Sequence, residues 1–293
     1  MSLASLNEDI RSVVRKAADS VVEVRARRGA PSSGVAWPGD GLLLTALHTV
    51  EDEEGIEIRT GSGESYPAEI AGRDPSTGIA LLRAKNASFA IPSWGDTAKL
   101  EAGELLILVA ASSSGRRVSL TTASVVTGEW TTDQGGRIHR YLETDSRLFP
   151  GFSGSVLLSA DGRALALNTA GLRRRAPLAI PVETLRPVVE KLLKHGDVRR
   201  GFLGITTYPI RLPDSVKSQQ TGLLVLSVQE GSPAAKAGLY LGDVLLGIDG
   251  RRVDSPAALL SLLGEERIGK TLEARILRTG KEETVSVSVG SRS

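Results

Sequence analysis

The chain begins with a helical pattern and then changes to a β pattern. Residues 1–20 form an amphipathic helical sequence. After it, short apolar runs are separated by Gly, Pro, Asp and Ser, the residues that turns prefer. The predicted strands are 21–26, 41–45, 55–59, 66–71, 79–83, 104–110, 117–126, 139–143, 155–158 and 164–169. Many short strands at this spacing predict a barrel or a sandwich.

A second unit follows a change of period near residue 181. Apolar residues in 181–194 recur at helical spacing, and His195-Gly196 is typical of a helix end. The sequence beyond predicts strands at 203–206, 222–228, 244–248, 272–277 and 284–289, with short helices at 232–237 and 256–263. At 293 residues the chain can hold two domains, which we place at 1–197 and 198–293.

Composition excludes several classes of protein. The 36 basic residues nearly balance the 34 acidic ones, so we expect no nucleic acid among the partners. The chain has no cysteine, and its three histidines are scattered, so we expect no metal and no other cofactor. No apolar stretch is long enough to cross a membrane, and the first residues lack the apolar region of a signal peptide.

Two short motifs carry the candidate chemistry. His48 follows the β run 41–45, and Ser153 lies between glycines in a tight loop. Acyl transfer by serine needs an imidazole to accept the hydroxyl proton and backbone N–H groups to stabilise the developing oxyanion. The amides of Gly151 and Ser153 are the candidate donors, and Gly154 allows the chain to pass closely beneath the nucleophile.

Several segments, in this order, resemble the HtrA (high-temperature-requirement A) family of trypsin-like serine proteases. They are the two motifs above, Thr144-Asp145, Leu167-Asn168-Thr169-Ala170, Ala179-Ile180-Pro181 and the junction 193–201. The resemblance implies a mainly β fold, with a chymotrypsin-type double β-barrel followed by a PDZ domain. It also implies an endopeptidase that acts on unfolded or exposed polypeptide.

The resemblance implies a catalytic triad that is incomplete here. His48 matches the general base and Ser153 the nucleophile. The family's aspartate falls at Gly78, in the segment 74–82. Asp74 is near in sequence, but four residues of extended chain span roughly 13 Å, so we do not expect it to substitute.

The resemblance also implies a specificity pocket. Arg147 falls where trypsin-like proteases place the pocket floor, although solvent exposure is the alternative because an unpaired buried arginine is costly. Asn168, Leu178 and Ile180 fall on the segments expected to form the walls, which suggests an apolar preference.

The second unit resembles a bacterial PDZ domain, which binds an extended peptide at a sheet edge. Phe202, Leu203, Gly204 and Ile205 match the loop that receives the peptide carboxylate. Leu259 on the later helix either lines the peptide groove or belongs to the core. The expected partners are unfolded segments or C-terminal peptides of other proteins.

Three functional hypotheses stay open. The first is an HtrA-like endopeptidase weakened by Gly78, and the second is an inactive pseudoprotease that binds peptides or partners. The third is that Gly78 is an engineered substitution. Phe149 and Phe152, where the family usually has asparagine, favour loss of activity, whereas the intact serine loop favours its retention.

Assembly and compartment are expectations from the resemblance alone. Family members assemble as trimers through aromatic residues near the start of the protease domain, but no aromatic residue precedes Trp37 here. Assembly into a homo-oligomer therefore stays an open alternative, whereas a trimer is disfavoured. The family's location predicts the bacterial cell envelope or periplasm, with the cytoplasm as the alternative because this sequence has no signal peptide.

Overall fold

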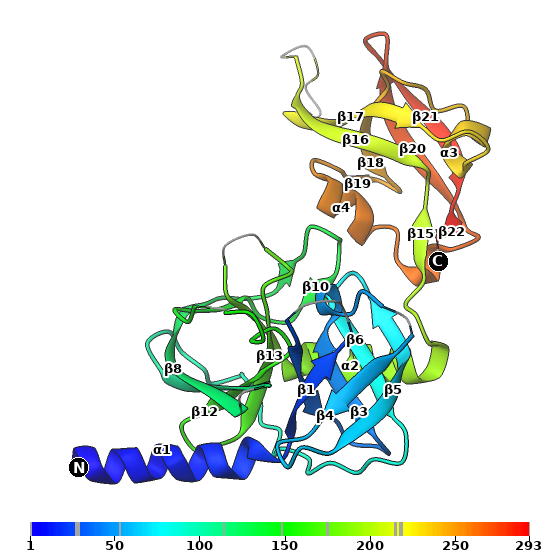
Figure 1. The fold of residues 1–293 in the computed structure, drawn as a ribbon. Coiled ribbons are helices and arrows are strands. Elements are labelled where there is room, and N and C mark those ends of the chain that lie inside the picture. Colours follow the sequence, from blue (N-terminus) through cyan, green and yellow to red (C-terminus); the bar gives the residue numbers. More distant parts are fainter. Residues whose placement is uncertain are drawn as a thin grey trace. The chain divides into compact units, whose positions relative to one another are not determined.

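The chain divides into two compact units in a computed structural model, which describes residues 2–26, 30–52, 54–113, 115–147, 149–173, 176–213, 216 and 219–292. One unit comprises residues 1–130 and 137–198, and the other comprises residues 131–136 and 199–293 (Figure 1). Within these described ranges, no helix combines the length and apolarity needed to span a bilayer.

Two closed six-stranded barrels make up most of the first unit, which confirms the predicted double β-barrel. The first barrel runs in the order β1-β2-β3-β6-β5-β4. Its strands are β1 (Val21–Arg25), β2 (Ser32–Ala36), β3 (Leu42–Ala46), β4 (Ile56–Arg59), β5 (Ser65–Asp74) and β6 (Ile79–Ala84). Strands β3 and β6 are almost wholly buried, as expected from the apolar residues that dominate their sequences.

The second barrel runs in the order β11-β14-β13-β12-β7-β8. Its strands are β7 (Leu105–Ser112), β8 (Gly115–Val126), β11 (Leu142–Thr144), β12 (Val156–Ser159), β13 (Ala164–Thr169) and β14 (Leu178–Pro181). Between β8 and β11 lies a small hairpin of β9 (Trp130–Thr131) and β10 (Arg137–Ile138). The helix α2 (Val182–His195) follows β14 directly and packs its apolar face against both barrels.

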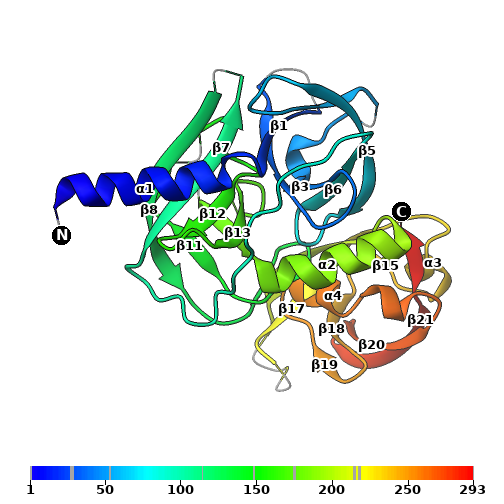
Figure 2. The same ribbon diagram turned by 90° about the horizontal axis from the view of Figure 1, so that it is seen from below.

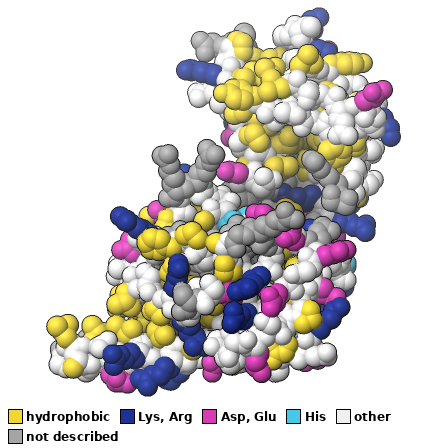
Figure 3. All heavy atoms as spheres, in the orientation of Figure 1, with side chains coloured by type: hydrophobic (Ala, Val, Ile, Leu, Met, Phe, Trp, Pro, Cys, Tyr) yellow, Lys and Arg dark blue, Asp and Glu magenta, His cyan; other side chains and the backbone are white. Residues whose placement is uncertain are grey.

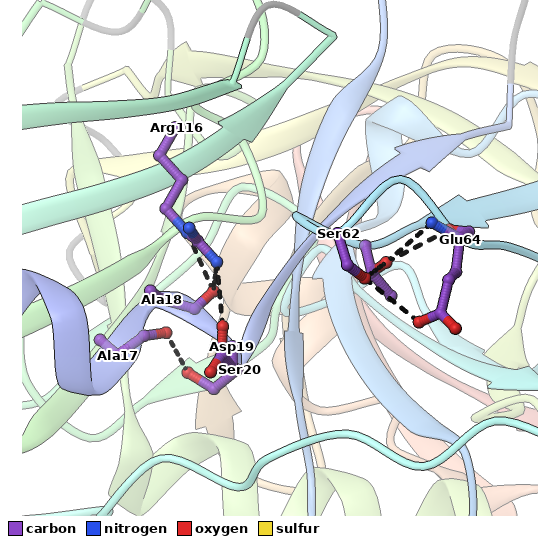
Figure 4. Close-up of polar contacts among 8 residues, drawn as sticks. Ala17, Ala18, Asp19, Ser20, Ser62, Glu64 and Arg116 are labelled. Atoms are coloured by element: carbon purple, nitrogen blue, oxygen red, sulfur yellow. Dashed lines mark hydrogen bonds and ion pairs between the residues drawn. The ribbon is translucent and has the colours of Figure 1, made fainter.

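Helix α1 (Leu3–Ala18) lies on the β7–β8 side of the second barrel (Figures 1 and 2). Its end is fixed by Arg116 of β8, whose Nε and Nη2 donate to the Ala18 carbonyl at 3.1 and 2.8 Å. Arg116 also pairs with Asp19, and Ser20 Oγ donates to the Ala17 carbonyl (Figure 4). These contacts make the helix end part of the unit.

Apolar side chains are exposed on the same side of this unit (Figure 3). They are Leu3 of α1 together with Leu105, Val118, Leu120 and Val125 of the β7–β8 hairpin. Only the last turns of α1 are buried, because its buried residues are Val13, Ala17 and Ala18.

The second unit is a sheet with short helices over its apolar core. The sheet order is β16-β17-β18-β20-β21, with β19 beside β18 and a separate β15–β22 pair. The strands are β15 (Arg200–Phe202), β16 (Ile205–Arg211), β17 (Thr221–Val228), β18 (Val244–Ile248), β19 (Arg251–Arg252), β20 (Thr271–Arg278), β21 (Lys281–Ser288) and β22 (Gly290–Arg292). The helices are α3 (Pro233–Lys236), α4 (Pro256–Ser261) and the 3-10 turn η2 (Glu265–Arg267).

Two local differences from the sequence prediction have clear causes. Strand β2 was not predicted because its sequence, Ser-Ser-Gly-Val-Ala, lacks an apolar run, yet all five residues are buried between two neighbouring strands. The predicted strand 203–206 begins only at Ile205, the first residue of β16, because residues 203 and 204 form a break between β15 and β16. Gly204 has φ of +81° there, a conformation that ends regular extended structure.

Candidate active site

His48 lies in a one-turn 3-10 helix, η1 (Leu47–Thr49), which follows β3 of the first barrel. The turn is closed by Thr49 Oγ1, which donates to the Ala46 carbonyl at 2.7 Å. The Leu47 amide donates to the Gly78 carbonyl at 2.8 Å. Gly78 therefore lies beside the turn that carries the histidine.

Ser153 lies in the loop before β12 of the second barrel, and two glycines shape that loop. Gly151 and Gly154 have φ of +97° and +83°. A Cβ on Gly154 would lie 1.9 Å from the Ser33 carbonyl oxygen, so only glycine fits. Ser33 holds the loop in return, because its amide donates to the Ser153 carbonyl at 3.0 Å and its hydroxyl to the Gly151 carbonyl at 2.7 Å.

Two consecutive residues after β13 bring the serine and the histidine into one site. The Ala170 amide donates to Ser153 Oγ at 3.3 Å. At the next residue, a Cβ built on Gly171 would lie 2.3 Å from Nδ1 of His48. One short segment thus touches both catalytic candidates, although they come from different barrels.

The two predicted oxyanion donors have no acceptor within the part of the chain that the structure describes. The Gly151 and Ser153 amides make no hydrogen bond there, whereas the neighbouring amides do. Phe152 N donates to the Phe149 carbonyl at 3.0 Å, and Gly154 N donates to the Asn168 carbonyl at 2.8 Å. Among the described residues, nothing occupies these two amides, so they are the candidate donors to a ligand oxygen.

Gly78, where the family resemblance places the aspartate, has φ of +70°. The segment 74–78 is a turn rather than the extended chain expected from the sequence, since Gly78 N donates to the Asp74 carbonyl at 2.9 Å. The buried Asp74 carboxylate accepts hydrogen bonds from the Ser76 amide and hydroxyl and from Thr77 Oγ1. Asp74 is therefore committed to its own turn.

The four residues predicted to form the specificity pocket lie in different environments. Arg147 is exposed, whereas Asn168, Leu178 and Ile180 are each at most 2% exposed. The Asn168 side chain donates to the Ser155 carbonyl at 3.3 Å. The three buried residues lie on the neighbouring strands β13 and β14, and Arg147 lies in the loop before Ser153.

The two phenylalanines of the serine loop differ in their surroundings. Phe152 is 4% exposed and packs in the apolar core inside the second barrel, while Phe149 is 54% exposed. Their ring centroids are 6.1 Å apart. Phe152 thereby anchors the residue before Ser153 in the barrel.

Sequence reasoning missed the residues that hold this site together. Ser33, Thr45 and Gly171 act through backbone or small side chains, which carry no catalytic motif. Ala170 belongs to a segment that resembles the family, but its contact with Ser153 was not predicted. A glycine two residues after the buried strand β13 was the one available signal at position 171.

In the second unit, β16 is an edge strand whose only sheet neighbour in the described chain is β17, and α4 lies beside it. The amides of Leu203 and Gly204, just before β16, make no hydrogen bond to another described residue. Phe202 and Ile205 are half-buried at the two ends of this loop. Leu259 is 5% exposed and belongs to the core.

Comparisons with known proteins agree with this architecture. The trypsin-like peptidase domain family matches residues 32–167, and the PDZ domain family matches residues 201–289. A probable periplasmic serine endoprotease, DegP-like, from Pseudomonas putida (strain GB-1) is 32% identical over 88% of this chain and 56% of its own length. The corresponding protein of Rhizobium meliloti is 31% identical over 92% of this chain and 55% of its own length.

Solved structures are similar over nearly the whole chain. The serine endoprotease from Yersinia pestis has a TM-score of 0.75 and 26% identity, covering 97% of this chain and 98% of that one. The HtrA-type protease AlgW, solved with a decapeptide, has a TM-score of 0.74 at 22% identity, with 97% and 98% coverage.

The present chain spans about half the length of the curated relatives it matches. It nevertheless contains two closed barrels followed by a PDZ domain. The chain belongs to the HtrA, or DegP-like, family, with a trypsin-like peptidase unit followed by one PDZ domain.

Proposed function

We propose that this protein is a weak HtrA-type serine endopeptidase of unfolded or exposed polypeptide, and that its PDZ domain recruits the peptide. The observation that carries the proposal is the segment Ala170–Gly171, which contacts Ser153 Oγ on one side and approaches His48 Nδ1 on the other. The amides of Gly151 and Ser153, which make no hydrogen bond to another described residue, support the same chemistry.

In this mechanism His48 accepts the proton of Ser153 as Oγ attacks the peptide carbonyl carbon. The Gly151 and Ser153 amides stabilise the resulting oxyanion. His48 then returns the proton to the leaving amine, and water hydrolyses the acyl-enzyme by the same steps in reverse. Arg147, Asn168, Leu178 and Ile180 are the residues we propose to define side-chain preference.

The absence of a carboxylate at Gly78 sets the expected rate. In serine proteases, loss of the triad aspartate lowers turnover by about 10⁴ while the oxyanion hole and the nucleophile remain. We therefore expect activity far below that of a complete triad. The second candidate function, a pseudoprotease that only binds peptides or partners, is favoured by Gly78 itself.

The decisive experiment compares cleavage of casein by the wild type and by Ser153→Ala. The proposal expects slow cleavage by the wild type that disappears in Ser153→Ala, because only the serine can form the acyl-enzyme. Equal rates for the two proteins would mean that the cleavage comes from a contaminant. That result, or no cleavage by either, favours the binding role.

Peptide recognition is proposed at the edge of β16, with the Leu203 and Gly204 amides receiving a terminal carboxylate. Gly204→Ala is expected to weaken binding of a C-terminal peptide with apolar side chains at least tenfold. Its Cβ would lie 2.2 Å from Ser232 Cβ, at φ of +81°, so the loop must move. Fluorescence anisotropy measures the change.

The matched control is Gly231→Ala, which has φ of +69° and no atom within 4 Å of the new Cβ. It should bind the peptide as the wild type does. Similar weakening in both variants would contradict a role for the 202–205 loop.

Boundaries and compartment complete the proposal. We propose a protease domain over 1–197 and a PDZ domain over 198–293. The two compact units of the structure support this division, since they meet at residues 198 and 199, although residues 131–136 group with the second unit. The curated relatives are described as probable periplasmic proteins, which supports a location in the periplasm or cell envelope.

A further inference from the structure

The space beside Gly78 is filled by one side chain. A Cβ built on Gly78 would lie 3.0 Å from Cδ2 and 3.6 Å from Cγ of Leu172. Apart from its neighbours in the chain, Gly78 would meet no other described atom within 4 Å of that Cβ. Leu172 is half-buried and packs against the apolar core shared by the two barrels. A carboxylate at position 78 would have to share this space with a leucine.

The same segment reaches the histidine. Gly171, the residue before Leu172, approaches Nδ1 of His48 so closely that any Cβ there would lie 2.3 Å away. A triad carboxylate accepts a hydrogen bond from Nδ1–H. The two consecutive residues Gly171 and Leu172 therefore approach both the nitrogen that such a carboxylate would face and position 78. Glycine at both 78 and 171 makes this close packing sterically feasible.

We propose that Leu172 is a positioning residue that blocks the carboxylate site beside His48, so that an aspartate at 78 can act only after Leu172 is made smaller. The proposal rests on the proposed Ser153–His48 chemistry. It means that two features together keep a carboxylate away from His48, the glycine at position 78 and the apolar side chain of Leu172 beside it.

The first test is a double-mutant cycle on thermal stability, which needs no activity. The proteins are wild type, Gly78→Asp, Leu172→Ala and the double variant. Gly78→Asp should lower the Tm in the wild-type background, and the loss should be smaller by about 3 °C in the Leu172→Ala background. The same loss in both backgrounds would overturn the proposal.

The second test measures the rate at which a fluorophosphonate probe labels Ser153. Gly78→Asp alone should gain less than about tenfold, and the double variant should gain about 100-fold or more over wild type. In the double variant the midpoint of the labelling rate against pH should move upward, because a carboxylate at Nδ1 stabilises imidazolium. Leu172→Ala alone should not shift that midpoint.

Two controls separate the alternatives. Gly78→Asn combined with Leu172→Ala fills the same volume without charge, tolerates positive φ and should show no upward pH shift. A gain of about 100-fold by Gly78→Asp alone would show that Leu172 is no obstacle. No labelling of the wild type would count against the proposed function, while the stability cycle would still decide the role of Leu172.

Discussion

Gly154→Ala is expected to destabilise the peptidase unit by more than about 3 kcal/mol and to remove probe labelling of Ser153. The new Cβ would lie 1.9 Å from the Ser33 carbonyl oxygen and 2.6 Å from Thr45 Oγ1, at φ of +83°. The Ser33 carbonyl cannot retreat easily, because it accepts the Thr45 hydroxyl and belongs to β2 of a closed barrel. The serine loop must therefore shift, and urea unfolding measures the loss.

Gly103→Ala is the control for backbone strain alone. Gly103 has φ of +93°, but its added Cβ would meet no described atom within 4 Å. We expect it to cost about 1 kcal/mol and to leave labelling near the wild-type rate. Equal destabilisation by the two variants would contradict the close approach beneath Ser153.

Arg278→Ala is expected to destabilise the PDZ unit by about 3 kcal/mol, because it leaves a buried carboxylate without its partner. Arg278 of β20 donates from Nε and Nη2 to both oxygens of Asp243, at 2.8 and 2.7 Å. The Asp243 side chain is 3% exposed. Arg278 also lies over the Tyr240 ring at 4.9 Å and donates to the Gly238 carbonyl.

The same pair gives the PDZ unit a pH dependence. Burial by itself would raise the pKa of Asp243, but the hydrogen bonds from Arg278 and the Tyr240 amide, with the charge of Arg278, bring it below the ordinary value of 3.8. The folded state thus favours the ionised carboxyl. Its stabilisation is complete above about pH 4 and is lost as the pH falls through the folded pKa.

Asp243→Asn combined with Arg278→Ala is the control for this prediction. It removes both charges, so its urea midpoint should change less between pH 7 and pH 3 than that of the wild type. An unchanged pH dependence in the double variant would assign the acid sensitivity to other carboxyls.

Apolar runs between turn residues predicted a barrel or sandwich followed by a second unit, and the family resemblance narrowed the first unit to a double barrel. Strand β2 escaped, since its burial comes from neighbouring strands rather than from its own side chains. The order of motifs pointed to His48 and Ser153, and it placed Gly78 where the family has its aspartate. The turn at 74–78, which commits Asp74 to Ser76 and Thr77, depends on local hydrogen bonds that apolar patterning does not report.

The rest of the site depends on contacts between segments distant in sequence. Ser33 fixes the serine loop from another barrel, and Leu172 reaches Gly78 across a gap of 94 positions in the chain. A leucine in a loop carries no pattern that predicts such a contact. Only the three-dimensional structure shows that Leu172 lies beside Gly78.

The central claim is that Ser153 and His48 form one reactive site. The most direct test is the rate of fluorophosphonate labelling of the wild type, His48→Ala and Ser153→Ala, each shown to be folded by its unfolding transition. The account predicts slow labelling of the wild type and a rate at least about 100-fold lower in His48→Ala. It predicts no labelling of Ser153→Ala, which lacks the labelled hydroxyl. Wild-type labelling that is unaffected by His48→Ala, or absent altogether, would contradict it.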